Sequence, residues 1–152
     1  MVPAIRQESA NLCGLAAVDS LASFHAVTLD AVALHALRSL ATEEGLSGAE
    51  LKACLEGAGF TCHVFKGTLD ETPTGLIRHL KAGRPLLVML GPEGKRHCAL
   101  VAGHDPERHL VALADPATGH VATPEAIFLE RWSQASHFTL LALPRLHQSP
   151  DP

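Results

Sequence analysis

Near its start the chain carries a polar stretch that leads directly into an apolar one, Gln7-Glu8-Ser9-Ala10-Asn11-Leu12-Cys13-Gly14 followed by Leu15-Ala16-Ala17-Val18-Asp19-Ser20-Leu21. Leu15, Val18 and Ala22 recur at helical spacing, which predicts a helix from Cys13 to about Phe24. Cys13 is therefore expected at the first position of that helix. The unpaired N–H groups there carry partial positive charge, which favours a thiolate over a thiol.

Three more helices are expected in the first half of the chain. An apolar stripe from Leu29 to Leu40 predicts the second. Ser47 and Glu50 have the spacing of a capping box, which starts the third helix, and a glycine at position 59 ends it. Thr72-Pro73 is expected to open the fourth, because proline is favoured at the first helical position.

Most of the remaining sequence has the short apolar runs that are typical of strands. We expect strands at residues 60–65, 85–90, 97–101, 110–114 and 137–143, turns at residues 91–94 and 105–106, and a short helix at residues 123–132. Helices followed by an antiparallel sheet indicate the α+β class. We expect one domain over residues 1–143 and a flexible tail over residues 144–152.

Composition narrows the class of protein. Of 152 residues, 47% are hydrophobic, so the chain can bury a core. The net charge is −4 and the sequence has no basic patch, which argues against nucleic acid as the main binding partner. No apolar stretch approaches the roughly 20 residues of a membrane span, and no signal core precedes residue 8, so we expect a cytoplasmic protein. The cysteines and histidines do not have zinc spacing; we expect free thiols, no metal and no cofactor.

Four side chains make a set suited to thiol chemistry. Cys13 is the candidate nucleophile, and His97, which opens a strand after a turn, is the candidate base. His104, at the other end of that strand, is its main competitor. Asp115 closes a strand before a proline and could orient the imidazole, while the amide of Gln7 could donate a hydrogen bond to an oxyanion.

The other three cysteines are interpreted as packing residues, because most free cysteines are small buried hydrophobes. Cys54 lies on the apolar face of the third expected helix. Cys62 and Cys98 fall inside expected strands.

The order of these residues resembles the bacteriocin-processing cysteine peptidases, papain-like domains that remove double-glycine leader peptides and are usually fused to peptide-exporting ABC transporters. The resemblance runs from Gln7 to Leu143. The first part of the pattern is a glutamine six residues before a Cys-Gly pair (Gln7 and Cys13-Gly14), a Gly-x-Ser segment that opens a helix (Gly45-Leu46-Ser47) and a Gly-aromatic step (Gly59-Phe60). The second part is a proline before an apolar strand (Pro85), a histidine at the head of the next strand (His97), an Asp-Pro pair (Asp115-Pro116) and a late tryptophan (Trp132).

The resemblance implies a papain-like fold and an endopeptidase that cuts a peptide or protein precursor after small residues. It also implies roles: Cys13 as nucleophile, His97 as general base, Asp115 as its orienter and Gln7 as oxyanion donor. Family members often carry an acidic residue before the cysteine, where this chain has Leu12. The chain has no Gly-x-x-x-x-Gly-Lys-Ser/Thr nucleotide loop, so we expect a stand-alone domain or a fragment, with a peptide exporter as a possible partner.

Two other functions compete with leader removal. One is a papain-like amidase, acyltransferase or effector protease that acts on another protein. The other is a module that binds its substrate without turnover, against which the intact set of Cys13, His97 and Asp115 argues.

Overall fold

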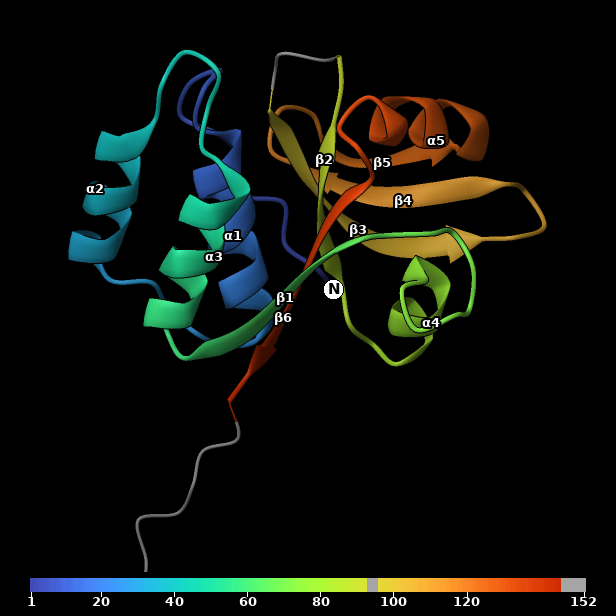
Figure 1. The fold of residues 1–152 in the computed structure, drawn as a ribbon, viewed down its shortest axis with the longest axis horizontal. Coiled ribbons are helices and arrows are strands. Elements are labelled where there is room, and N and C mark those ends of the chain that lie inside the picture. Colours follow the sequence, from blue (N-terminus) through green and yellow to red (C-terminus); the bar gives the residue numbers. More distant parts are fainter. Residues whose placement is uncertain (93–95, 146–152) are drawn as a thin grey trace, which may run out of the picture.

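One antiparallel sheet organises the computed structural model, which describes residues 1–92 and 96–145 (Figure 1). Its six strands lie in the order β1-β6-β2-β3-β4-β5 and span Phe60–Lys66 (β1), Leu86–Leu90 (β2), His97–Asp105 (β3), Leu110–Asp115 (β4), Gly119–Pro124 (β5) and Phe138–Pro144 (β6). The helices are Cys13–Phe24 (α1), Ala31–Leu40 (α2), Gly48–Gly57 (α3), Leu76–Lys81 (α4) and Glu125–Ser133 (α5). The expected α+β class and the papain-like arrangement of helices against an antiparallel sheet are confirmed.

The sheet separates two apolar cores. Helices α1 to α3 cover one face, and α4 and α5 cover the other (Figure 1). Strand β2 serves both: Leu87 and Met89 join the first core, whereas Leu86, Val88 and Leu90 join the second. Side chains alternate across a strand, so a strand buried on both faces reads as a continuous apolar run.

The start of the third helix agrees with the expected capping box. The Ser47 hydroxyl accepts a hydrogen bond from the Glu50 backbone N–H at 3.2 Å, and the Glu50 carboxylate accepts one from the Ser47 N–H at 2.7 Å. Each residue thereby satisfies a donor that helix formation leaves unpaired.

The fourth helix begins later than its sequence predicts. It starts at Leu76 rather than at Thr72-Pro73, because Asp70 holds Thr72 in a turn by hydrogen bonds. The Asp70 carboxylate accepts hydrogen bonds from the Thr72 N–H at 3.0 Å and the Thr72 hydroxyl at 2.6 Å. Such local side-chain bonds compete with helix formation and favour a turn.

The second half of the sheet also departs from expectation. Strand β3 continues to Asp105 instead of ending at Val101, and β5 was not predicted. Half-buried and exposed positions alternate along β5, but none of its residues is buried, and it has no continuous apolar run to mark it. It is held by backbone pairing with β4, from Asp115 opposite Gly119 to Leu110 opposite Pro124. Helix α5 then begins at Glu125, without a side-chain cap from Thr123.

The first residue of the expected tail, Pro144, belongs to the sheet instead. Pro144 ends β6, and the Arg145 N–H donates to the Gly59 carbonyl at 2.9 Å. Residues 146–152, for which a flexible tail is expected, and residues 93–95, in the expected turn after β2, lie outside the described residues.

Two glycines should respond oppositely to substitution by alanine. A methyl group on Gly67 would lie 2.6 Å from the ring of fully buried Trp132, whereas one on Gly57, at the end of α3, meets nothing within 4 Å. Gly67→Ala should lower the free energy of unfolding by about 1–3 kcal/mol. Gly57→Ala should leave it unchanged or raise it by up to about 1 kcal/mol. Urea unfolding measures both, and equal effects would contradict the packing described around Trp132.

Candidate active site

Cys13 lies at the N-terminus of α1, against the start of β3. Its residue is only 3% exposed. The sulfur lies 3.0 Å from the Arg96 carbonyl oxygen, to which the thiol form donates a hydrogen bond, and it accepts one from the Cys98 backbone N–H at 3.3 Å. Leu12, the N-cap residue, offers no side-chain cap, so no side chain there competes for the partial positive charge of the first helical turn.

His97 and Asp115 complete a line with Cys13. The imidazole Nε2 lies 2.9 Å from Asp115 Oδ2, and Asp115 Oδ1 accepts the Ala117 N–H at 2.8 Å. His97 is also close enough to Cys13 for each to shift the pKa of the other, and since Nε2 is engaged by Asp115, Nδ1 is the ring nitrogen left for the sulfur. Asp115 is 5% exposed, so its position is fixed by buried contacts rather than by solvent.

The surroundings of Cys13 and His97 favour a negatively charged thiolate beside a positively charged imidazolium. The pKa of the Cys13 thiol is lowered to about 5, and the largest cause is a hydrogen bond from the Cys98 side chain. Burial works to raise this pKa, whereas a hydrogen bond and the charge of His97 lower it further. The hydrogen bond to Asp115, followed by that to Cys13, raises the pKa of His97 to about 9. Between these values the site holds a thiolate and an imidazolium.

The carboxylate of Asp115 stays charged in its buried position. Burial works to raise the pKa of Asp115, but the hydrogen bonds from His97 and the Ala117 N–H, together with the nearby charges of His97 and Arg131, outweigh it and lower that pKa. A buried anion is thus balanced by the imidazolium that it holds.

The other thiols have the opposite character. Burial, with a smaller effect of Glu56, raises the pKa of Cys62 to about 11. Burial, with the charges of Asp19 and Asp30, also raises the pKa of Cys54. Cys13 alone among these three is activated.

Gln7 lies beside the same end of the sheet. Its backbone N–H donates to the Pro116 carbonyl at 3.0 Å, directly after Asp115. Its side-chain oxygen Oε1 is buried without a hydrogen-bond partner among the described residues. The two ends of an amide are nearly isosteric, so a flip would direct N–H groups to the same point.

The structure distinguishes between the two histidines of β3. His104 pairs with Glu125 through Nε2 and Oε2 at 2.7 Å, near the opposite end of the strand. His97, not His104, is brought to Cys13 and Asp115.

Sequence reasoning missed the part that Cys98 plays at this site. Cys98 is fully buried, as expected of a packing residue, but it contacts Cys13 through both its backbone N–H and its thiol. Its position next to His97 was the available signal. Strand alternation directs the two side chains to opposite faces, however, and only the tertiary fold brings α1 against the face that carries Cys98.

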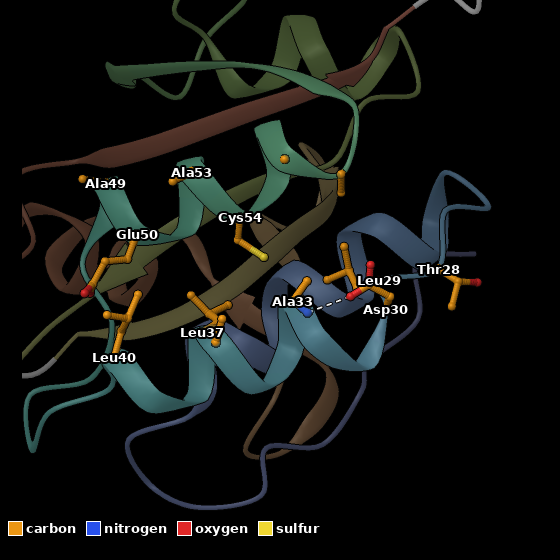
Figure 2. Close-up of a pocket in the computed structure, with 13 residues that line it drawn as sticks. Thr28, Leu29, Asp30, Ala33, Leu37, Leu40, Ala49, Glu50, Ala53 and Cys54 are labelled. Carbon is orange, nitrogen blue, oxygen red and sulfur yellow. Dashed lines mark hydrogen bonds between the residues drawn. The ribbon is translucent and has the colours of Figure 1, made fainter.

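An apolar groove lies elsewhere, between α2 and α3 (Figure 2). It has a volume of about 670 Å³ and is lined by small and apolar side chains that include Ala33, Leu37 and Ala53, with Cys54 in its wall. None of the candidate catalytic residues lines it. A smaller pocket, of about 380 Å³, reaches His97 and Asp115.

Two searches over the described parts of the chain gave negative results. Within residues 1–92 and 96–145, no three histidine, cysteine, aspartate or glutamate side chains gather closely enough to hold a metal ion. Over the same ranges, no helix has the length and apolar character needed to cross a membrane.

Comparison with known proteins identifies relatives of this fold. The model of the Peptidase C39 family matches residues 1–142. The peptidase domain of Streptococcus ComA, a bifunctional ABC transporter involved in quorum sensing, has a TM-score of 0.77 at 17% identity, covering 95% of this chain and 100% of that one. No curated protein sequence matches the chain significantly.

Two further solved structures share the fold. A putative C39-like peptidase from Bacillus anthracis has a TM-score of 0.74 at 16% identity and covers 95% of each chain. A double-glycine-motif protease from an AMS/PCAT transporter, solved in complex with the leader peptide, has a TM-score of 0.69 at 16% identity, over 95% of this chain and 92% of that one.

The thiolate of Cys13 should be detectable by its reaction with iodoacetamide. Because the pKa of Cys13 is about 5, its alkylation rate should rise through that pH and be near its plateau at pH 6. An ordinary cysteine, with a pKa of about 8.5, would react about three hundredfold below its plateau there. The measurement is peptide mapping of labelled protein across pH, with Cys62 as the internal control.

An inflection above about pH 8 would contradict the ion pair. So would faster labelling of Cys62 than of Cys13 at neutral pH. His97→Ala should move the Cys13 inflection to higher pH, because it removes a hydrogen bond and a positive charge that favour the thiolate.

Proposed function

The chain belongs to the Peptidase C39 family and is a cysteine peptidase, and from this premise we propose that it is an endopeptidase that removes a double-glycine-type leader from a peptide precursor. The observation that carries the proposal is the line of contacts from Cys13 through His97 to Asp115. The three residues come from α1, β3 and β4, and each is buried or half-buried.

In the proposed reaction, the Cys13 thiolate attacks the scissile carbonyl, and an acyl-enzyme forms. His97, protonated at the start, gives its proton to the leaving amine and then activates the water that releases the acyl group. Asp115 holds Nε2 of the imidazole, so that Nδ1 keeps facing the sulfur in both steps. Free N–H groups at the start of α1 add stabilisation of negative charge.

We assign Gln7 to the oxyanion of the tetrahedral intermediate. The Oε1 atom of its amide is buried and lacks a partner in the described residues, and its backbone N–H donates to the Pro116 carbonyl beside the triad. A preorganised amide donor has its largest effect where charge develops during the reaction.

Limited access to Cys13 supports the proposed preference for small residues, which the family resemblance implies. With 3% of the residue exposed, the sulfur is best reached by a substrate backbone without a bulky side chain next to the cut. The leader peptide bound by the AMS/PCAT relative supports a peptide of this class. The proposal includes a cytoplasmic location and cooperation with a peptide exporter, as the ComA relative combines both activities in one transporter.

Binding without turnover is the weaker alternative, because the thiol, imidazole and carboxylate are assembled with the pKa directions that catalysis requires. Amide hydrolysis or acyl transfer on another protein would use the same acyl-enzyme. It differs only in the acceptor and in the sequence around the cut.

Leader-like peptides test the substrate class. A peptide with Gly-Gly before the scissile bond should be cleaved after the second glycine, and replacing that glycine by leucine should block cleavage, because the side chain would meet the covered sulfur. Product analysis by mass spectrometry measures both, with Cys13→Ala as the inactive control. Equal cleavage of the two peptides would refute the preference, and cleavage by Cys13→Ala would refute the nucleophile.

Gln7→Ala tests the oxyanion donor. It should lower kcat about a hundredfold or more, equivalent to about 3 kcal/mol, with little change in KM, because the interaction strengthens only in the transition state. Stability should change by under about 0.5 kcal/mol, since the backbone bond to Pro116 remains and an unpaired buried oxygen is removed.

The matched control for Gln7→Ala is its neighbour Glu8, an exposed partner of Arg38. Glu8→Ala should leave kcat unchanged. An unchanged kcat in Gln7→Ala would remove Gln7 from the reaction, and a large fall in melting temperature would make its role structural.

A further inference from the structure

A second thiol lies against the candidate nucleophile. The Cys98 N–H donates to the Cys13 sulfur at 3.3 Å, and both thiols use the Arg96 carbonyl as acceptor, at 3.0 Å from Cys13 Sγ and 3.7 Å from Cys98 Sγ. The Cys98 thiol also lies within hydrogen-bonding range of the Cys13 sulfur. The triad chemistry needs only one nucleophilic sulfur, so peptide cleavage uses Cys98 only through its effect on the pKa of Cys13.

The two cysteines differ in access. The Cys13 sulfur must be reachable by a substrate carbonyl, and it is therefore also open to a molecule as small as a peroxide. Cys98 is 0% exposed, so a reagent in solvent does not reach it directly. The Cys13 sulfur lies 3.3 Å from the Cys98 backbone nitrogen, so the two cysteines meet the first requirement of a disulfide, which is close approach.

We propose that Cys98 is a resolving thiol, and that a peroxide converts Cys13 and Cys98 to a disulfide that switches the peptidase off reversibly. In the first step, the Cys13 thiolate attacks one peroxide oxygen: an S–O bond forms, the O–O bond breaks, and hydroxide leaves and takes the proton of the His97 imidazolium. In the second, Cys98 attacks the sulfur of the resulting sulfenic acid. The S–S bond forms, the S–O bond breaks, and the Cys98 proton leaves with the hydroxide as water.

The resting site suppresses any earlier reaction of Cys98. The hydrogen bond with Cys13, then burial, then the Cys13 charge raise the pKa of Cys98 well above its ordinary value. Oxidation of Cys13 removes the thiolate charge, and thereby one of the causes that keep Cys98 protonated. Cys98 thus becomes easier to deprotonate at the stage when its attack is required. The disulfide would also spare Cys13 the higher oxidation states that cannot be reversed.

Peroxide treatment of the whole chain, followed by alkylation and peptide mapping without reductant, tests the proposal through the thiols themselves and needs no substrate. In wild type, Cys13 and Cys98 should lose their alkylation together, the intact mass should fall by two hydrogens, and dithiothreitol should restore both thiols. In Cys98→Ala, Cys13 should instead gain two or three oxygens that dithiothreitol does not remove. Cys62→Ala, which removes another buried thiol, should behave like wild type.

Oxygen added to Cys13 in wild type while Cys98 remains alkylatable would overturn the proposal, as would a Cys13 that does not react with peroxide. If Cys98→Ala fails to fold, Cys98→Ser replaces it. If neither variant folds, the peptide map of oxidised wild type decides. Loss and recovery of cleavage in step with the disulfide would add the regulatory consequence. A protein that forms the disulfide but cuts no Gly-Gly peptide would leave the switch intact and refute only the proposed substrate.

Discussion

The site depends on a single junction, where the N-terminus of α1 meets the first residues of β3. At this junction the Cys13 sulfur contacts the Arg96 carbonyl and the Cys98 N–H, while the side chain between them, His97, belongs to the triad. The Arg96 N–H is itself bonded to the Glu44 carbonyl at 3.2 Å, just ahead of α3. Three segments that are distant in sequence therefore fix the position of one sulfur atom.

The position of the Cys13 sulfur depends largely on contacts with backbone groups, and the low sequence identity to the solved relatives is consistent with that dependence. The relatives share only 16–17% of aligned residues with this chain, yet their folds superimpose over nearly its whole length. Many contacts at the junction use peptide groups, which any residue supplies, and Ala117 likewise holds Asp115 through its N–H. Substitution can then change many side chains without removing the backbone contacts that position Cys13.

Features encoded within a few residues were predictable from sequence, and those created by long-range contact were not. The start of α1 at Cys13 and the capping box at Ser47 follow from local spacing, and both are confirmed. The late start of α4 depends on hydrogen bonds of Asp70 that propensity does not reveal, and β5 depends on pairing with β4. The contact of Cys98 with Cys13 could not be predicted, because it forms only when the N-terminus of α1 packs against the face of β3 that carries Cys98.

The place of β6 has a consequence for how the two parts of the sheet are joined. The last strand in the sequence lies between β1 and β2, and β1 pairs with no other strand of the described structure, so β1 gains its sheet neighbour only when residues 138–144 are in place. Removal of β6 would therefore separate β1 from the four strands β2 to β5.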